Sequence, residues 1–339
     1  MNALWLRCRE HALFWPAVTL ILLIGAGALF NPSFLAISWR DGHLYGSLID
    51  VLNRAAPLIV VSLGMTLVIA VRGLDISVGA TIAISAAVVA LMIGGNFSAG
   101  GDAAPDYPLG VAVAAALGVA ALCGLWNGAL IVLGGLQPIV ATLILMVAGR
   151  GIAQLLTGGQ IITVYYPPFF ALGNGYWLGL PVALWIAAAL FAILSLAVNR
   201  TALGLFIRAI GGNPRAARVA GIRAGSLTMC VYVFCGLAAG IAGLIISSNV
   251  KSADANNAGS LMELDAILAV TLGGTALTGG RFSLAGTVLG ALIIQTLTSL
   301  IYSLGVPPEV NLVVKAALVF TVMLLQSPDF RALVTRARA

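Results

Sequence analysis

The sequence predicts an all-α polytopic membrane protein, and three observations lead to that class. Of 339 residues, 61% are hydrophobic and only 8% are charged, whereas a soluble domain carries about 25% charged residues. The mean hydropathy is +1.08. Many apolar runs approach the roughly 20 residues that a helix needs to cross about 30 Å of hydrocarbon. Runs of about ten alternating residues, typical of a membrane barrel, are absent from the sequence.

Ten candidate spans follow one another in a single transmembrane domain, residues 1–339. The first is preceded by Arg7 and Arg9 and therefore resembles a signal peptide. We expect it to be retained as a helix, because the rest of the chain is also built to cross a membrane. The ten expected spans cover approximately residues 14–30, 48–70, 76–94, 109–134, 138–158, 180–198, 227–248, 264–278, 284–304 and 309–325.

Basic residues predict how the chain is oriented. Placing the N-terminus in the cytoplasm puts 12 of the 17 basic residues in cytoplasmic segments, as the positive-inside rule requires. Both termini are then cytoplasmic, which needs an even number of spans. This bias explains the net charge of +6. We therefore expect membrane lipids, and not nucleic acid, among the partners.

A weak internal repeat favours a transporter. Leu74-Asp75-Ile76 opens the third span and Leu264-Asp265-Ala266 opens the eighth. Gly128-Ala129-Leu130-Ile131 in the fourth span matches Gly290-Ala291-Leu292-Ile293 in the ninth. Because five helices separate the matched segments, we expect spans 2–5 and 7–10 to form an inverted repeat, a common transporter architecture.

The segment 199–226 is the only long polar stretch predicted on the cytoplasmic side. Within it, Asn213 suits a helix N-cap, Pro214 the first helical position and Gly221 the left-handed position after the helix. A helix this short needs a partner to dock on. An ordinary positively charged loop is the alternative. The residues expected to contact a cytoplasmic ATPase are Arg208, Asn213, Pro214, Arg215, Ala216, Ala217, Arg218 and Gly221.

Polar residues at membrane depth are candidates for a solute path. Asp75 lies in a glycine-flanked interruption, residues 71–79, and a carboxylate there is costly unless it is paired. Its alternative role is structural, through pairing with Arg72 or the backbone. Polar residues within spans can equally form hydrogen bonds between helices. The path candidates are Asn53, Asp75, Ser77, Asn127, Thr142, Gln154, Asp265 and Gln295.

The loop 253–259, expected on the outer side, is polar and flexible. Its residues Asp254, Asn256 and Asn257 are candidates for contact with an external binding protein or the substrate. A solvated loop explains them as well. We therefore keep both interpretations.

Neither a catalytic site nor a phosphate-binding loop is evident in the sequence. The nearest approach to a phosphate loop, 274–281, lacks its Lys and Ser/Thr, and no His, Cys and carboxylate cluster suggests a metal. We expect a non-enzymatic chain without a bound cofactor. A transporter driven by an ion gradient stays open because of Arg150, Lys315 and Asp75, and a membrane enzyme acting on lipid-linked substrates is a further alternative.

Several of these segments resemble the permease subunits of bacterial sugar ABC importers of the ribose, xylose and galactose type. The resemblance runs from about residue 40 to 327. The stretch Gly73-Leu74-Asp75-Ile76-Ser77-Val78-Gly79 is typical of that family, and the loop 253–259 is typical of galactofuranose-type permeases. The other matching segments are 50–57, 64–70, 140–151, 221–222 and 263–270.

This resemblance implies a type II importer fold like that of the vitamin B12 importer, in the bacterial inner membrane. It implies a second permease copy or sister permease, ABC ATPase subunits that bind ATP-Mg, and a periplasmic sugar-binding protein. The substrate is expected to be a galactofuranose-, galactose- or ribose-like monosaccharide. Residues 213–221 then match the family's coupling helix, although Arg215 stands where the family has an acid. A branched-chain amino-acid importer permease shares the fold and is the alternative.

Overall fold

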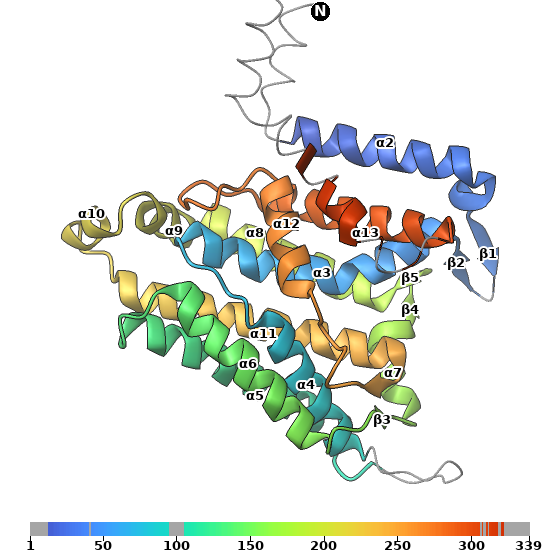
Figure 1. Ribbon diagram of the computed structural model, residues 1–339, viewed down its shortest axis with the longest axis horizontal. Coiled ribbons are helices and arrows are strands. Elements are labelled where there is room, and N and C mark those ends of the chain that lie inside the picture. Colours follow the sequence, from blue (N-terminus) through green and yellow to red (C-terminus); the bar gives the residue numbers. More distant parts are fainter. Residues whose placement is uncertain are drawn as a thin grey trace, which may run out of the picture.

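A computed structural model describes residues 13–40, 42–94, 105–305, 307, 310, 312–317 and 320–321. The long helices lie along the longest axis of the molecule, with α10 at one end and the short strands at the other (Figure 1). We call these the α10 end and the strand end. Most of the described residues are helical, as the composition predicts.

Most of the helices coincide with expected spans, and four short ones lie outside them. They are α2 (Phe14–Phe30), the 3-10 helix η1 (Pro32–Leu35), α3 (Ser47–Ala70), α4 (Val78–Ile93), α5 (Leu109–Val132), α6 (Pro138–Leu156), α7 (Pro167–Asn174), α8 (Val182–Arg200), α9 (Leu203–Gly212), α10 (Pro214–Val219), α11 (Ala224–Val250), α12 (Met262–Leu272) and α13 (Leu284–Ser303).

Three pairs of short antiparallel strands lie in the segments between the helices. They are β1 (Ser38–Arg40) with β2 (His43–Tyr45), β3 (Ile162–Thr163) with β6 (Ser252–Ala253), and β4 (Tyr176–Trp177) with β5 (Leu180–Pro181). The sequence analysis does not predict these pairs. Strands of two or three residues carry too little alternation to be recognised.

Among the described residues, six helices are long and apolar enough to cross a membrane: α3, α5, α6, α8, α11 and α13. Each coincides with an expected span to within a few residues. The shorter apolar helices α2 and α4 coincide with the first and third spans. The tenth expected span, 309–325, falls largely outside the described residues.

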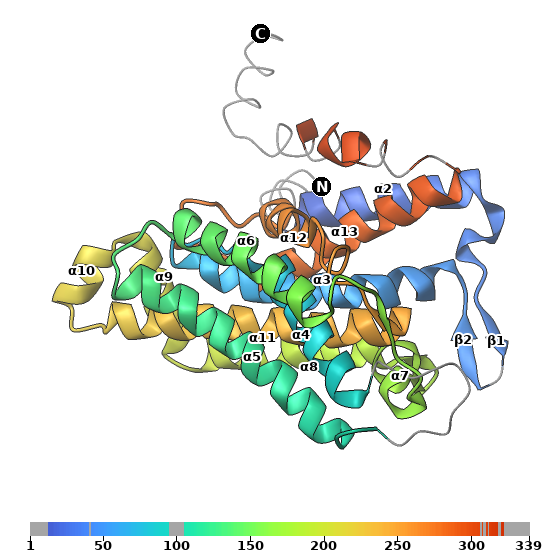
Figure 2. The same cartoon turned by 60° about the horizontal axis from the view of Figure 1, so that its bottom comes forward.

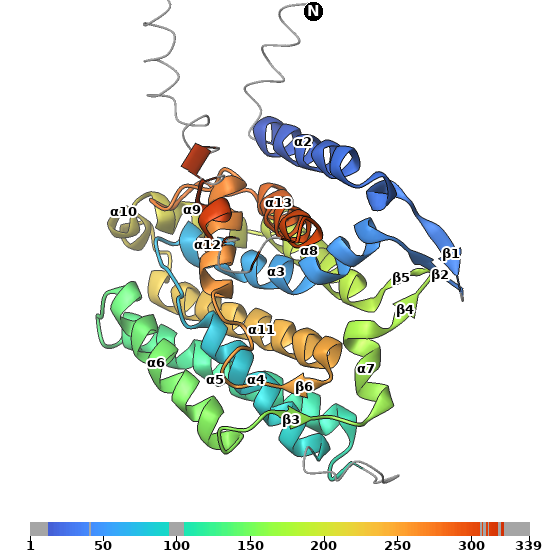
Figure 3. The ribbon, with the colours of Figure 1, turned by 45° about the vertical axis from the view of Figure 1, so that its right-hand side comes forward.

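The eighth expected span is wrong in length. Residues 264–278 were expected to form it, but α12 has 11 residues and ends at Leu272, which gives a length of only about 16 Å. The helix stops where Gly273 packs against the backbone of Gly286 and Gly274 takes a left-handed conformation with φ of 85°. In Figures 1 and 3 the helix stands across α3 instead of lying along it.

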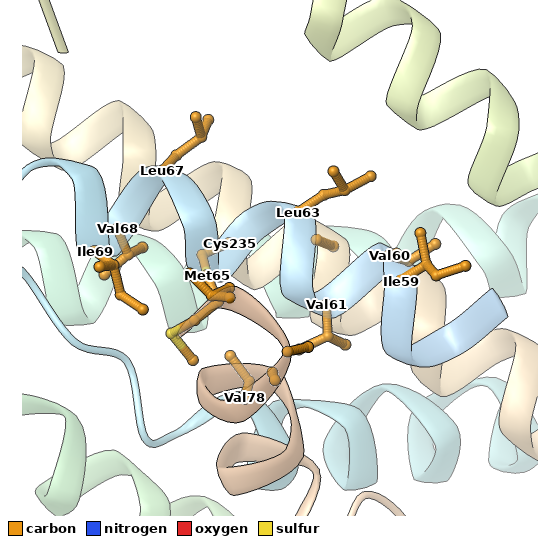
Figure 4. Packing of buried hydrophobic residues seen from close by; sticks show 14 of the residues in the cluster. Ile59, Val60, Val61, Leu63, Met65, Leu67, Val68, Ile69, Val78 and Cys235 are labelled. Atoms are coloured by element: carbon orange, nitrogen blue, oxygen red, sulfur yellow. The ribbon is translucent and has the colours of Figure 1, made fainter. Parts of the chain in front are cut away.

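The core is built around α3. From Ala55 to Ala70 this helix is buried on all sides, as expected for a helix that is hydrophobic all round. Figure 4 shows its aliphatic side chains packed with Val78 of α4 and Cys235 of α11. Gly64 lets the backbone of α11 approach, because a Cβ there would lie 3.1 Å from the Cα of Cys235.

The helices around this core pack in an exchanged pattern. α3 and α11 pack against each other, α11 packs against α4 and α5, and α3 packs against α12 and α13. Figure 2 shows α5 and α13 on different sides of this central pair. Thus α11 packs against the two helices that follow α3 in the chain, and α3 packs against the two helices that follow α11.

Candidate transport site and coupling surface

Three of the path candidates meet in the first break, which we define as residues 71–77 between α3 and α4. The Asp75 Oδ1 atom accepts hydrogen bonds from the Ser77 backbone N at 3.0 Å and from the Ser77 Oγ at 2.6 Å. Asn127 of α5 donates its Nδ2 to Ser77 Oγ at 2.8 Å and to Asp75 Oδ1 at 3.4 Å. All three residues are fully buried, so they form one polar cluster inside the bundle.

Arg72 does not pair with Asp75, contrary to one of the two structural roles expected for that carboxylate. Its Nε donates to the Gly211 carbonyl at 2.6 Å and its Nη2 to the Gly212 carbonyl. The expected backbone pairing of Asp75 is present through the Ser77 N–H. The guanidinium of Arg72 is thus engaged with the end of α9, and the Arg72 backbone is left-handed, with φ of 65°.

Thr142 and Tyr232 lie beside the same break. The Thr142 hydroxyl bonds mainly to the Pro138 carbonyl of its own helix, at 3.0 Å, and reaches the Leu74 carbonyl at 3.4 Å. The Tyr232 hydroxyl donates to the same Leu74 carbonyl at 3.4 Å. The sequence analysis missed Tyr232, since a tyrosine in an apolar run of α11 carries no signal of such a contact.

The second break, residues 251–261 between α11 and α12, contains the polar loop. Asp254 Oδ1 accepts from the backbone N of Asn256 at 2.9 Å and of Asn257 at 3.1 Å, while Oδ2 accepts from Asn257 Nδ2 at 2.7 Å. Gln154 of α6 donates to Asn256 Oδ1 at 2.6 Å. Partial burial raises the pKa of Asp254, but these hydrogen bonds together hold it below its usual range.

Arg150 of α6 donates hydrogen bonds to backbone carbonyls of the second break. Its Nη1 donates to the carbonyls of Ala255 at 3.0 Å and Ala258 at 2.7 Å, and approaches that of Asn256 at 3.4 Å. Backbone carbonyls of an irregular segment need such partners where they are shielded from water. The residue was noticed as an ionisable group within a span, but its role as a donor to this loop could not be predicted.

The second break also brings the beginnings of α4 and α12 together. Gly79, in the first turn of α4, touches the Gly259 carbonyl and the carboxylate of Glu263, which is in the first turn of α12. Glu263 is 5% exposed. The N-terminal ends of both helices carry positive partial charge, which favours a carboxylate there. The sequence analysis missed Glu263, although an acid in the first turn of a helix is a recognisable signal.

The remaining path candidates lie elsewhere. Asp265 forms an ion pair of 2.8 Å with Lys315. Gln295 lines a hollow of about 230 Å³ near Asp50 and Arg54, and Asn53 has a buried Oδ1 without a hydrogen bond among the described residues. The eight candidates are therefore not gathered in one cavity of this chain. Arg150 and Lys315, which left a proton-driven transporter open, are both engaged in hydrogen bonds.

The structure of α10 follows the expected capping pattern. The Asn213 side chain accepts hydrogen bonds from the backbone N of Arg215 and Ala216, each at 3.1 Å. Pro214 is the first helical residue, and Gly221 has a φ of 84° after the helix. Arg215 and Arg218 are exposed, so the helix presents two positive charges at one end of the molecule.

Around α10 the segment 199–226 is more ordered than a loop. It contains α9, which the sequence analysis did not predict, and Ala217 is buried whereas Ala216 is exposed. Arg208 lies on α9, not on α10, with its guanidinium 5.5 Å from the centre of the Phe282 ring. A largely apolar groove of about 520 Å³ lies beside α10. It is lined by Leu203, Phe206, Ala220, Gly221, Ile222, Arg223, Ser226, Leu227 and Cys230.

Fold and site together define a helical polytopic membrane protein. Long apolar helices surround two interrupted segments with buried polar groups, and a basic capped helix projects from one end. Across the described part of the chain, no group of three or more His, Cys, Asp and Glu side chains could hold a metal ion.

Comparison with known proteins gives the family. The family model described as the permease component of a branched-chain amino acid transport system matches residues 47–323, and the chain belongs to this family. It is 47% identical to the galactofuranose transporter permease protein YtfT of Escherichia coli, over 96% of this chain and 94% of that one. No solved structure matches the chain significantly.

Two further relatives are also named as sugar permeases. The chain is 36% identical to the fructose import permease protein FruF of Bifidobacterium longum, over 95% of this chain and 89% of that one. It is 34% identical to the ribose import permease protein RbsC of Escherichia coli, over 91% and 92%. These relatives are transport subunits and not enzymes.

Proposed function

We propose that this chain is the permease subunit of an ATP-driven importer of a monosaccharide, a galactofuranose-, galactose- or ribose-like sugar. The relatives named for galactofuranose, fructose and ribose support the sugar class over branched-chain amino acids. The observation that carries the coupling to ATP is α10, a capped, exposed and basic helix in a chain whose sequence has no phosphate-binding loop. Hydrolysis of ATP-Mg belongs to separate ABC ATPase subunits.

In this proposal the α10 end faces the cytoplasm and the strand end faces the periplasm of the bacterial inner membrane. Both termini are cytoplasmic, and the chain has ten membrane segments in a type II importer arrangement. The eighth segment consists of the short helix α12 and the non-helical residues 273–283 that follow it. The exchanged packing of α3 with α12 and α13, and of α11 with α4 and α5, supports an inverted repeat of spans 2–5 and 7–10. A second permease copy or sister permease completes the path.

The mechanism is alternating access. Closure of the ATPase dimer pushes on segment 199–226 through α10 and the adjoining groove, while a sugar-loaded binding protein contacts Asp254, Asn256 and Asn257 at the opposite end. The two halves then rock around a path that passes the two breaks. Support comes from the exposure of Arg215 and Arg218 in α10 and of Asn256 and Asn257 in the second break.

A co-purification experiment tests this function. The chain is expressed with and without a candidate partner ABC ATPase, purified in detergent and placed in nanodiscs. We expect the ATPase to co-purify and its hydrolysis rate to rise with a sugar-loaded binding protein. Purification alone, with transport in liposomes driven by an ion gradient, would contradict the proposal.

The double variant R215E/R218E tests the coupling surface. Reversing two exposed charges should weaken ATPase association at least about tenfold, since charge complementarity at an interface is worth several kcal/mol when it is reversed. R40E, which changes an exposed arginine of β1 at the strand end, is the control. Full ATPase-coupled transport by the double variant would exclude α10 as the coupling element.

A further inference from the structure

Arg72 forms a direct connection between the end of α3 and the end of α9. Its Nε donates to the Gly211 carbonyl at 2.6 Å and its Nη2 to the Gly212 carbonyl. The guanidinium thus forks across two successive carbonyls, a geometry that the point charge of a lysine cannot reproduce. These contacts join residues that are about 140 positions apart in the sequence.

The accepting carbonyls are at the position where α9 passes into α10. Gly211 and Gly212 are the last two residues of α9, and the next residue, Asn213, is the N-cap of α10. Carbonyls in the last turn of a helix lack partners within the helix and carry negative partial charge. Arg72 satisfies two of them, so any displacement of α10 pulls on this side chain.

A third segment is joined at the same point. The Gly280 backbone N, between α12 and α13, donates to the Ala70 carbonyl at 2.9 Å. A Cβ on Gly211 would lie 2.3 Å from the Gly280 N, and one on Gly279 would lie 2.6 Å from the Cγ of Arg72. Three backbones therefore touch with no side chain between them, and they cannot move independently.

At its other end the first break is anchored deep in the bundle. Tyr232 bonds to the Leu74 carbonyl, and Asp75 and Ser77 bond to each other and to Asn127. Residues 71–77 are thus held by α9 at one end and by α5 and α11 at the other. The segment has little freedom to absorb a displacement, and it leads straight into α4.

We infer that Arg72 is a positioning residue that transmits the movement of α10 to the first break and hence to α4. The inference rests on the proposed function, since it assumes that α10 is driven by an ATPase. It assigns a route within this chain: from α10 through the last turn of α9 to Arg72, and from there along residues 73–77 to the beginning of α4.

The test uses R72A and R72K in the complete complex, with R281A as the matched control. Arg281 is an exposed arginine beside the same junction, and it makes no hydrogen bond or ion pair within the described residues. We expect R72A to keep its ATPase and its basal hydrolysis but to lose sugar transport at least about tenfold, the scale of a lost charge-assisted hydrogen bond. Stimulation by the sugar-loaded binding protein should be lost as well.

R72K separates coupling from folding. It keeps the charge but reaches only one carbonyl, so we expect intermediate transport per ATP hydrolysed, with thermal unfolding in detergent unchanged. R281A should behave as the wild type. Wild-type transport per ATP hydrolysed in R72K or in R72A would overturn the inference and leave the proposed function intact.

Hydrogen exchange on the wild-type complex provides a measurement that needs no variant. Trapping the ATPase in its closed state should change the protection of residues 71–77 together with that of 203–220. A change confined to 203–220 would overturn the inference. If instead the wild-type chain binds no ATPase at all, the proposed function fails first, and that outcome is distinguishable from the others.

Discussion

Buried polar residues in this chain form hydrogen bonds with the irregular backbone of the two breaks. Asp75 accepts three hydrogen bonds within the first break and its surroundings, and Arg150 donates to carbonyls of the second. At membrane depth an unsatisfied polar group costs several kcal/mol. Each of these side chains therefore stabilises a local structure that apolar residues could not maintain.

The substitution D75A tests this role. It removes the acceptor for the Ser77 N–H and leaves buried donors without a partner, which costs about 1–3 kcal/mol. We expect a lower midpoint of thermal unfolding in detergent. S62A is the control, because the buried Ser62 Oγ has no hydrogen-bond partner among the described residues and its loss should change little. Equal midpoints for D75A and S62A would show that Asp75 is not structural.

At the scale of elements, glycines decide how closely the helices pack. A Cβ on Gly124 of α5 would lie 2.3 Å from the Tyr232 carbonyl of α11, whereas one on Gly118 of the same helix meets nothing within 4 Å. Small residues that permit close backbone approach are typical of membrane helix interfaces. The α5–α11 contact therefore depends on Gly124.

G124A and G118A form a matched pair that differs only in position along α5. Forcing a methyl group against the α11 backbone should destabilise the protein by about 1–3 kcal/mol, while G118A should be neutral or slightly stabilising, since alanine favours a helix more than glycine does. Thermal unfolding in detergent measures both. Two equal midpoints would contradict the packing argument.

At the scale of the whole molecule, the two breaks form a related pair. Each follows one of the central helices α3 and α11. Each contains an aspartate that accepts a hydrogen bond from the backbone N–H two residues later. An arginine at the start of the first break, and an arginine outside the second, donates hydrogen bonds to backbone carbonyls. The first lies towards the α10 end and the second is reached from the strand end (Figure 1). This arrangement suits a carrier that opens alternately to its two sides.

R150A tests the role of the second break in the proposed importer. Without the Arg150 donor, the carbonyls of Ala255 and Ala258 lose their partner, and the loop 254–259 should loosen. We expect weaker stimulation of ATP hydrolysis by the sugar-loaded binding protein, with unchanged ATPase co-purification. R40A, at an exposed arginine of β1, is the control. Full stimulation in R150A would mean that the loop's position does not matter for this partner.

The helical membrane class, most helix positions and the capping of α10 could be predicted from the sequence alone. These depend on composition, apolar run length and residues adjacent in the chain, which act locally. Asn213, Pro214 and Gly221 act within nine residues of one another, so their roles were predictable.

Which polar groups meet depends on contacts between residues far apart in the chain, so it became visible only in the folded molecule. Asp75 bonds to Asn127, 52 residues away, and Arg72 to Gly211, 139 residues away, and no local pattern records such partners. The short α12 depends on Gly273 packing against Gly286 of another helix. The length of an apolar run indicates how strongly a segment prefers lipid or a protein core. It does not indicate where contact with a neighbouring backbone ends the helix. That is why 264–278 was predicted as a full span.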